Sequence, residues 1–139
     1  MKVKNKILKD EEITSANLEA LFKAASITTD RDDDGDLVLL DNGIPTFIGI
    51  DAERKLLSFY VIWGLKSRMS AEDKRAFANK LNDSLILVRF AVGGKDLWFD
   101  YNLLYEGGLS TFTILNTYKQ FASICEEVIA ENRELFGKC

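Results

Sequence analysis

Apolar residues recur at the spacing of an amphipathic helix in three segments of the chain. The first, over residues 15–26, carries a narrow stripe, and the second, over residues 71–81, has only Phe77 and Leu81 as large apolar anchors. The third, over residues 111–134, is broader, and its apolar positions are Leu115, Tyr118, Phe121, Ala122, Cys125, Val128 and Ile129. A helix with such a wide apolar face is expected to cover a sheet.

Between these helices the pattern changes to short runs of apolar, β-branched and aromatic residues, which predict strands. Four runs precede the second helix and two follow it, at residues 27–31, 36–41, 45–51, 55–63, 85–92 and 96–105. Asn42-Gly43 is typical of a hairpin turn with positive φ at both residues, and Gly93-Gly94 predicts a second hairpin. Ser70, with Asp73 three residues later, predicts the start of the second helix. The element order is therefore α-ββββ-α-ββ-α.

The length of 139 residues favours a single domain over residues 1–139, with a polar N-terminal leader over residues 1–13. The net charge of −4 gives no attraction to the phosphates of nucleic acids or to anionic lipids, so neither is an expected partner. The basic start of the chain lacks the apolar core of a signal peptide, because Asp10, Glu11 and Glu12 come next. The expected location is the cytoplasm.

The side chains that serve most enzyme sites are scarce. The chain contains no histidine, which excludes Ser-His-Asp and Cys-His nucleophilic sites and histidine-based zinc sites. Its two cysteines, Cys125 and Cys139, form no metal-binding or redox motif, and Cys125 falls on the apolar stripe of the last predicted helix. We therefore predict no catalytic residue, no cofactor and no enzymatic activity.

One acidic stretch, residues 30–41, matches the spacing of a calcium-binding loop. Oxygen ligands at loop positions 1, 3, 5, 7 and 12, with glycine at position 6, would be Asp30, Asp32, Asp34, Asp36, Asp41 and Gly35. Such a loop needs a helix on each side, whereas Asp41 leads directly into Asn42-Gly43 and Pro45. We therefore predict a solvated hairpin tip and no metal site.

Several stretches together resemble the YbjN-domain family. They are DDDGDLVLL, IPTFIGIDAERKLLSFYV and LILVRFAVGGKDLWFDYNLLYEGGLS, and the junction Leu103–Ser110 before the last helix is the most specific of them. The resemblance covers about residues 13–135. It implies an α+β fold similar to that of type III secretion chaperones, with a twisted antiparallel sheet and helices, often paired as a homodimer. The family is described as bacterial sensory transduction regulators, and the resemblance implies no catalytic residue.

Two predicted strands, 55–63 and 85–92, are apolar almost without interruption, which is typical of strands covered on both faces. Three helices are few for covering two faces, so two interpretations remain open. The second face is an interface with a second copy or a client protein, or the strands are central and the domain's own helices bury them. The candidate interface residues are Tyr60, Trp63, Phe90 and Trp98.

These observations favour a cytoplasmic, non-enzymatic protein-binding domain that forms a homodimer and acts as a chaperone or adaptor. An immunity-type protein that neutralises one toxin or enzyme is an alternative of the same size and acidity. A third interpretation is a small-ligand receptor or an enzyme without a recognised motif. In it, Asp100, Arg89 and Tyr101 would project from adjacent strands into a pocket.

Overall fold

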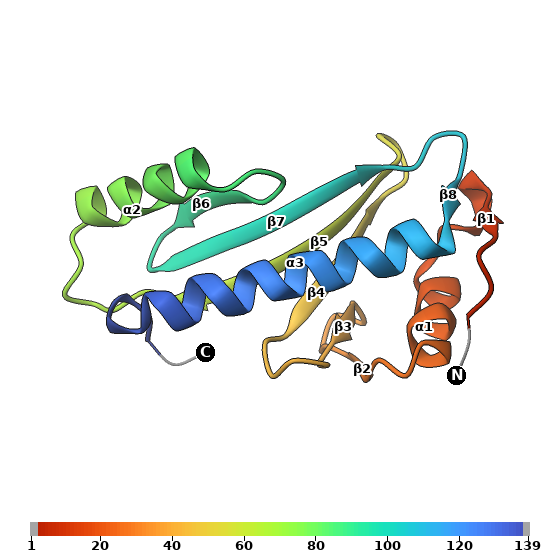
Figure 1. Cartoon of the computed structure of the whole chain (residues 1–139), viewed down its shortest axis with the longest axis horizontal. Coiled ribbons are helices and arrows are strands. Elements are labelled where there is room, and N and C mark those ends of the chain that lie inside the picture. The colour runs from red at the N-terminus through yellow and green to blue at the C-terminus, as the bar shows by residue number, and fades with distance from the viewer. Residues whose placement is uncertain (1–2, 138–139) are drawn as a thin grey trace.

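The structure, a computed structural model, describes residues 3–137. Within this range the chain forms one six-stranded antiparallel sheet with the strand order β2-β3-β4-β5-β7-β6 (Figure 1). β5 and β7 are the longest strands and pair along their whole length, from Leu56 opposite Leu104 to Gly64 opposite Asp96. The strands are β2 (Thr29–Arg31), β3 (Leu37–Leu39), β4 (Thr46–Asp51), β5 (Leu56–Gly64), β6 (Arg89–Gly93) and β7 (Asp96–Leu104).

The three α-helices of this range all lie on one face of the sheet. The long helix α3 runs along the sheet, with α1 near one end and α2 near the other (Figure 1). Their bounds are α1 (Ser15–Ala24), α2 (Ala71–Ser84) and α3 (Thr111–Glu131). The α+β architecture and the predicted order α-ββββ-α-ββ-α are confirmed for the three α-helices and the six-stranded sheet, with helices that end a few residues earlier or later than expected.

The core lies between these helices and one face of the sheet. Successive side chains of a strand point to opposite faces, so every second residue of β5 and β7 enters the core. The ring of Phe59 on β5 lies 6.4 Å from that of Phe22 on α1. Phe136 connects α2 to the sheet, because its ring lies 5.8 Å from Phe77 and 6.2 Å from Phe99. The fully buried residues of α3 and the two long strands are Leu57, Phe59, Val61, Leu97, Phe99, Ile114, Phe121 and Cys125.

Each α-helix begins at a side-chain cap. The hydroxyl groups of Thr14, Ser70 and Ser110 accept hydrogen bonds from backbone N–H groups three residues later. Each cap of this kind contributes about 1 kcal/mol. The predicted start of the second helix is confirmed, since the N–H of Asp73 donates to Ser70 at 3.0 Å.

The turn at Asn42-Gly43 differs from the prediction. Gly43 has a φ of +76°, but Asn42 is not one of the described residues with positive φ. Its side chain accepts a hydrogen bond from the N–H of Ile44 at 3.2 Å and donates to the C=O of Ala122 on α3 at 3.4 Å. The prediction of positive φ at both residues is therefore wrong, because Asn42 turns the chain with its side chain instead.

The strand predicted over residues 85–92 begins only at Arg89. α2 continues to Ser84, and the N–H of Leu85 still donates to the C=O of Leu81 at 2.9 Å. Leu87 then has a φ of +78°, a left-handed conformation that turns the chain before the strand starts. At the other end of the chain, α3 stops at Glu131 and is followed by a 3₁₀ turn, Arg133–Leu135.

The described part of the leader, residues 3–13, packs against the rest of the domain. β1 (Ile7–Leu8) pairs with β8 (Leu109–Ser110) in a second, two-stranded sheet. The Thr111 hydroxyl accepts the N–H of Lys6 at 3.1 Å and donates to the C=O of Lys4 at 2.8 Å. The pairing of β1 with β8 and these hydrogen bonds were not predicted, because they join distant positions, 105 residues apart for Lys6 and Thr111, and no local pattern marks a contact of that range.

The backbone conformation of the Leu103–Ser110 junction requires its two glycines. Gly107 and Gly108 have φ values of +86° and +99°, which residues other than glycine rarely adopt. A Cβ atom at Gly108 would lie 2.8 Å from the carbonyl oxygen of Leu8. The turn therefore lets β1 approach closely, and the carboxylate of Asp10 accepts the N–H of Gly107 at 2.8 Å.

Candidate functional site

The candidate site lies on the face of the sheet opposite the helices. No helix of residues 3–137 packs on it (Figure 1). Cross-strand pairing places Phe47, Tyr60, Asp100 and Arg89 in one row across four strands. We call this surface the open face, and its central residues are Phe47, Gly49, Asp51, Ser58, Tyr60, Arg89, Trp98, Asp100 and Asn102.

Three aromatic rings stack across the open face. The ring centroids of Phe47 and Tyr60 are 5.3 Å apart with an interplanar angle of 19°, and those of Tyr60 and Trp98 are 6.0 Å apart at 15°. Trp98 is 37% exposed. Stacked rings of this kind form a rigid, partly apolar surface across the three neighbouring strands β4, β5 and β7.

A polar network lies beside the aromatic row. The guanidinium of Arg89 donates to both carboxylate oxygens of Asp100, with Nε–Oδ1 at 3.1 Å and Nη2–Oδ2 at 2.8 Å. The side-chain amide of Asn102 donates to Asp100 at 3.1 Å, and the Ser58 hydroxyl donates to Asn102. The hydrogen bonds that Arg89 donates to Asp100, together with the negative charge of that carboxylate, raise the pKa of Arg89. The Asp100 carboxylate is therefore neutralised and held in place by its neighbours.

A shallow depression of about 380 Å³ lies over Gly49. It is bounded by side chains of the aromatic row and of the polar network, namely Asp51, Ser58, Tyr60, Arg89, Trp98, Asp100 and Asn102. A Cβ atom at Gly49 would meet Tyr60 at 3.6 Å and Ser58 at 3.7 Å, which are ordinary contacts. The depression therefore exists because residue 49 has no side chain, and a side chain there would fill it.

The acidic stretch forms the tip of the β2–β3 hairpin near this surface. One carboxylate oxygen of Asp32 accepts the N–H groups of Asp34 and Asp36, both at 2.9 Å. Carboxylate oxygens of Asp32, Asp34 and Asp36 lie within 4.8 Å of one another. Burial raises the pKa of Tyr60, and the charges of Asp36 and Asp32 raise it further, so the tip adds negative potential to the open face.

The predicted hairpin tip is confirmed and the twelve-residue calcium loop does not form. Asp30 lies within β2, and Asp41 lies beyond β3, so the first and last ligands of that loop belong to the two arms of the hairpin. A strand, not a helix, follows the tip. The aspartates act here through backbone hydrogen bonds and charge.

The four candidate interface residues are divided between the two faces of the sheet. Tyr60 and Trp98 lie on the open face. Phe90 pairs with Phe99, is 3% exposed and packs on that ring at 5.2 Å, so it belongs to the core of the single chain. Trp63 pairs with Leu97 and also lies on the helix side. The reason is alternation, since a shift of one position along a strand reverses the face.

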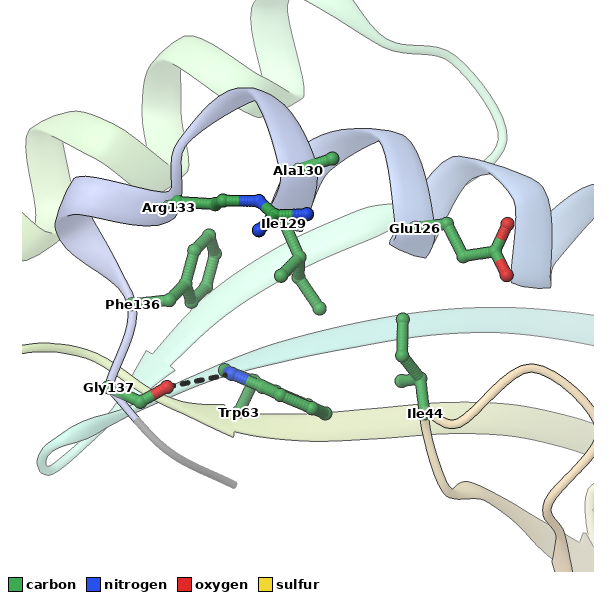
Figure 2. Close-up of a pocket in the computed structure, with 8 residues that line it drawn as sticks. All are labelled: Ile44, Trp63, Glu126, Ile129, Ala130, Arg133, Phe136 and Gly137. Carbon is green, nitrogen blue, oxygen red and sulfur yellow. Dashed lines mark hydrogen bonds between the residues drawn. The ribbon is translucent and has the colours of Figure 1, made fainter.

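Trp63 lines a second hollow, between the end of α3 and the sheet. Figure 2 shows its indole near Ile44, with Ile129 and Phe136 above it, and with the charged side chains of Glu126 on α3 and of Arg133 on the 3₁₀ turn that follows α3. The hollow has a volume of about 380 Å³ and a mostly apolar lining. The indole N–H donates to the C=O of Gly137 at 3.1 Å, so Trp63 also fastens the end of the described chain to β5.

The three residues of the ligand-pocket interpretation do not converge. Asp100 and Arg89 form their ion pair on the open face. Tyr101 follows Asp100 on β7, so it points to the other face and packs against the core. The pocket of Asp100, Arg89 and Tyr101 expected from adjacent strands is therefore wrong, and the depression beside the first two contains other residues instead.

Several residues of the open face were not identified from the sequence. Phe47, Gly49, Ser58 and Asn102 carry no motif. Residues an even number of positions apart on one strand share a face, so Ser58 could have been grouped with Tyr60, and Asn102 with Trp98. Extending the group across strands to Phe47 and Gly49 requires the strand register, which the sequence does not give.

Comparisons with known proteins agree with this fold. None of the curated proteins compared with the chain matches it. A solved structure, "Crystal structure of YbjN, a putative transcription regulator from E. coli", superposes with a TM-score of 0.75 at 13% sequence identity, covering 91% of this chain and 96% of that one. Such a distant likeness shows a shared fold.

No helix within residues 3–137 is both long enough and apolar enough to span a membrane.

The profile of the YbjN family, described as "Putative bacterial sensory transduction regulator", matches residues 14–134 and so includes the whole six-stranded sheet and all three α-helices. The chain therefore belongs to the YbjN family.

Proposed function

We propose that this protein is a cytoplasmic, non-enzymatic protein-binding domain, chaperone- or adaptor-like, and that it holds its client on the open face. The observation that carries the proposal is the row of Phe47, Tyr60 and Trp98, which stack on a sheet face that has no helix over it. A family description as a regulator is consistent with binding rather than catalysis.

The physics of interfaces supports this use of the open face. Tyrosine and tryptophan are enriched among the residues that dominate binding energy, because they bury a large area at a small cost in side-chain entropy. Here they stand on the two longest paired strands, β5 and β7, so little backbone ordering is needed on binding. The polar network around Asp100 lies beside them and supplies hydrogen-bonding groups, as the rim of an interface does.

The chemistry of the same face supports a non-catalytic role. The Asp100 carboxylate accepts from Arg89 and Asn102, so it is poorly placed to act as a base. The Ser58 hydroxyl donates to Asn102, and the chain contains no histidine that could activate it. A binding surface is the simpler interpretation of these side chains.

We also propose that the protein forms a homodimer, through a surface other than the open face. The strand residues on the open face include four aspartates and one arginine, so two open faces brought together would bring like charges into the interface. Like charges in an interface oppose association. The dimer would thus leave both open faces free for clients.

The client proposal is tested by capture with the wild type and with Trp98→Asp. Tagged protein is recovered from its native cells, bound proteins are identified with their stoichiometry, and the dominant one is purified and bound again in vitro. Trp98→Asp should weaken this binding at least about tenfold, because it places a charge in the aromatic row. Phe112→Asp is the matched control, since Phe112 is 44% exposed on α3, away from the open face.

Client binding that is unchanged in Trp98→Asp would contradict the proposal. Circular dichroism and sedimentation of both variants check folding and the dimer. A dimer lost in Trp98→Asp alone would show that the open face pairs with itself. If the dominant partner is a toxin or an enzyme that the protein inhibits, the immunity-type alternative is correct.

A further inference from the structure

We propose that the open face recognises a positively charged segment of its client, and that an arginine or lysine side chain of this segment enters the depression over Gly49. This inference rests on the proposed function and adds the chemistry of the partner. It depends on the charges of the open face, the shape of the depression and the aromatic side chains beside it.

The open face is more acidic than the chain as a whole. Of the strand residues that point to this side, four are aspartates and one, Arg89, is basic. The whole chain has 22 acidic and 18 basic residues. The aspartates are Asp30, Asp51, Asp96 and Asp100.

Within residues 3–137, most of this negative charge has no strong partner. Arg89 neutralises Asp100, with an Nη2–Oδ2 distance of 2.8 Å. Asp51 lies 3.8 Å from Arg54, whose side chain is 78% exposed, and a pair of that kind contributes little. The hairpin tip adds Asp32 and Asp36, whose charges reach Tyr60. The face therefore attracts cations and repels nucleic acids and acidic proteins.

Arg89 shows how this surface holds a guanidinium group. Its donors bind both oxygens of Asp100 in the fork-to-carboxylate geometry that arginine favours. The depression next to this pair is lined by a second carboxylate, that of Asp51, and by the rings of Tyr60 and Trp98. An incoming guanidinium or ammonium would find a carboxylate on one side and aromatic rings on the other, the combination that stabilises a desolvated cation.

Gly49 makes this inference testable without unfolding the protein. Its φ is not in the left-handed region, and a Cβ atom there has ordinary contacts with Tyr60 and Ser58. Valine favours strands, so Gly49→Val should be tolerated while its side chain fills the depression. Asp36→Asn with Asp51→Asn removes two charges and keeps the shape. Glu126→Gln with Glu127→Gln on α3 removes two charges elsewhere.

The probe is a ten-residue peptide of alternating arginine and serine. In the control peptide each arginine is replaced by citrulline, which keeps the shape of the side chain and removes its charge. Binding is measured by tryptophan fluorescence in Trp63→Phe, where Trp98 is the single reporter, at two salt concentrations. We expect the arginine peptide to bind, with affinity that falls as salt rises. The Asp36/Asp51 variant and Gly49→Val should each weaken binding roughly fivefold or more, and the citrulline peptide about tenfold.

If Glu126→Gln with Glu127→Gln weakens binding of the arginine peptide equally, the inference is overturned, since the affinity would then depend only on the net charge of the protein. Equal binding of the citrulline peptide, or no binding of either, would also overturn it. The proposed function can fail separately. If Trp98→Asp abolishes client capture while the Asp36/Asp51 variant and Gly49→Val do not, the open face binds a client but does not select for charge.

Discussion

Tyr118 carries a hydroxyl group into the core. The side chain is 1% exposed, and its hydroxyl has no hydrogen-bond partner among the described residues. Burial raises its pKa to about 12, and the charge of Asp41 adds to the effect. The folded protein therefore keeps this phenol neutral at a pH where an exposed tyrosine has lost its proton.

This predicts a loss of stability in alkali that Tyr118→Phe removes. The pKa of Tyr118 is higher in the folded state, so its contribution is complete below pH 10 and is lost as the pH rises towards 12. By pH 11 the free energy of unfolding of the wild type should fall roughly 1 kcal/mol relative to that of Tyr118→Phe. Urea denaturation from pH 8 to pH 11 measures this difference.

At pH 8 the variant should be as stable as the wild type or slightly more so, because it removes an unpaired buried hydroxyl. Burial also raises the pKa of Cys125, but that thiol is present in both proteins and cancels in the comparison. If the free energies of unfolding of the two proteins change in parallel over the whole pH range, Tyr118 is not buried as described.

At the scale of elements, β6 is an edge strand whose outer backbone groups at Phe90 are hydrogen-bonded by a side chain. β6 is the last strand of the sheet, so its outer backbone groups have no strand partner within the described chain. Asn82 of α2 occupies this position, accepting the N–H of Phe90 at 2.9 Å and donating to its C=O at 2.8 Å. An amide side chain thus takes the place of a neighbouring strand and protects the edge from pairing with another chain.

Asn82→Ala should expose this edge. We expect stability to fall by about 1 kcal/mol, because two backbone groups lose their partners, and we expect concentration-dependent self-association. Asn79→Ala is the control: it lies on the exposed side of the same helix and gains the same helix propensity. Urea denaturation, sedimentation velocity and hydrogen exchange at the Phe90 amide measure the two effects. Identical behaviour of the two variants would show that the Asn82 hydrogen bonds are unimportant.

At the scale of the whole molecule, one core holds all three α-helices to the sheet. Buried residues of α1, α2 and α3 belong to a single cluster with those of β5 and β7. Phe136 links the last segment of the chain to α2 and to β7. Because no helix has a core of its own, none is expected to remain folded without the sheet.

Unfolding should therefore be a single transition. Trp98 reports on the open face and Trp63 on the hollow beside α3. In Trp63→Phe the fluorescence midpoint in urea should equal the midpoint of helical circular dichroism, and the same should hold in Trp98→Phe. A helical signal that outlasts the fluorescence change in either variant would reveal a separate folding unit.

Residue patterns predicted the elements well where the pattern was local. Ser70 begins α2, and the acidic stretch forms a hairpin tip. Local patterns failed where distant contacts contribute: the Asn42 side chain, which accepts the N–H of Ile44, also donates to Ala122 on α3, and β1 pairs with β8, which lies about 100 positions later in the chain. For the site, Tyr60 and Trp98 were identified, but Trp63 and Phe90 could not be assigned to a face because one position of register reverses it.

By itself, the sequence determined the α+β class, the order of helices and strands, the family and the absence of histidine chemistry. The fold class and the order of elements follow from local spacing and turn residues, the lack of histidine from composition, and the family from the resemblance of several sequence stretches, and none of these needs knowledge of contacts. The tertiary structure alone decided that all three helices cover one face, that Phe47, Tyr60 and Trp98 stack on the other, and that a depression opens over Gly49. These depend on strand register and on which surfaces find a partner, and both are set by packing between segments far apart in the chain.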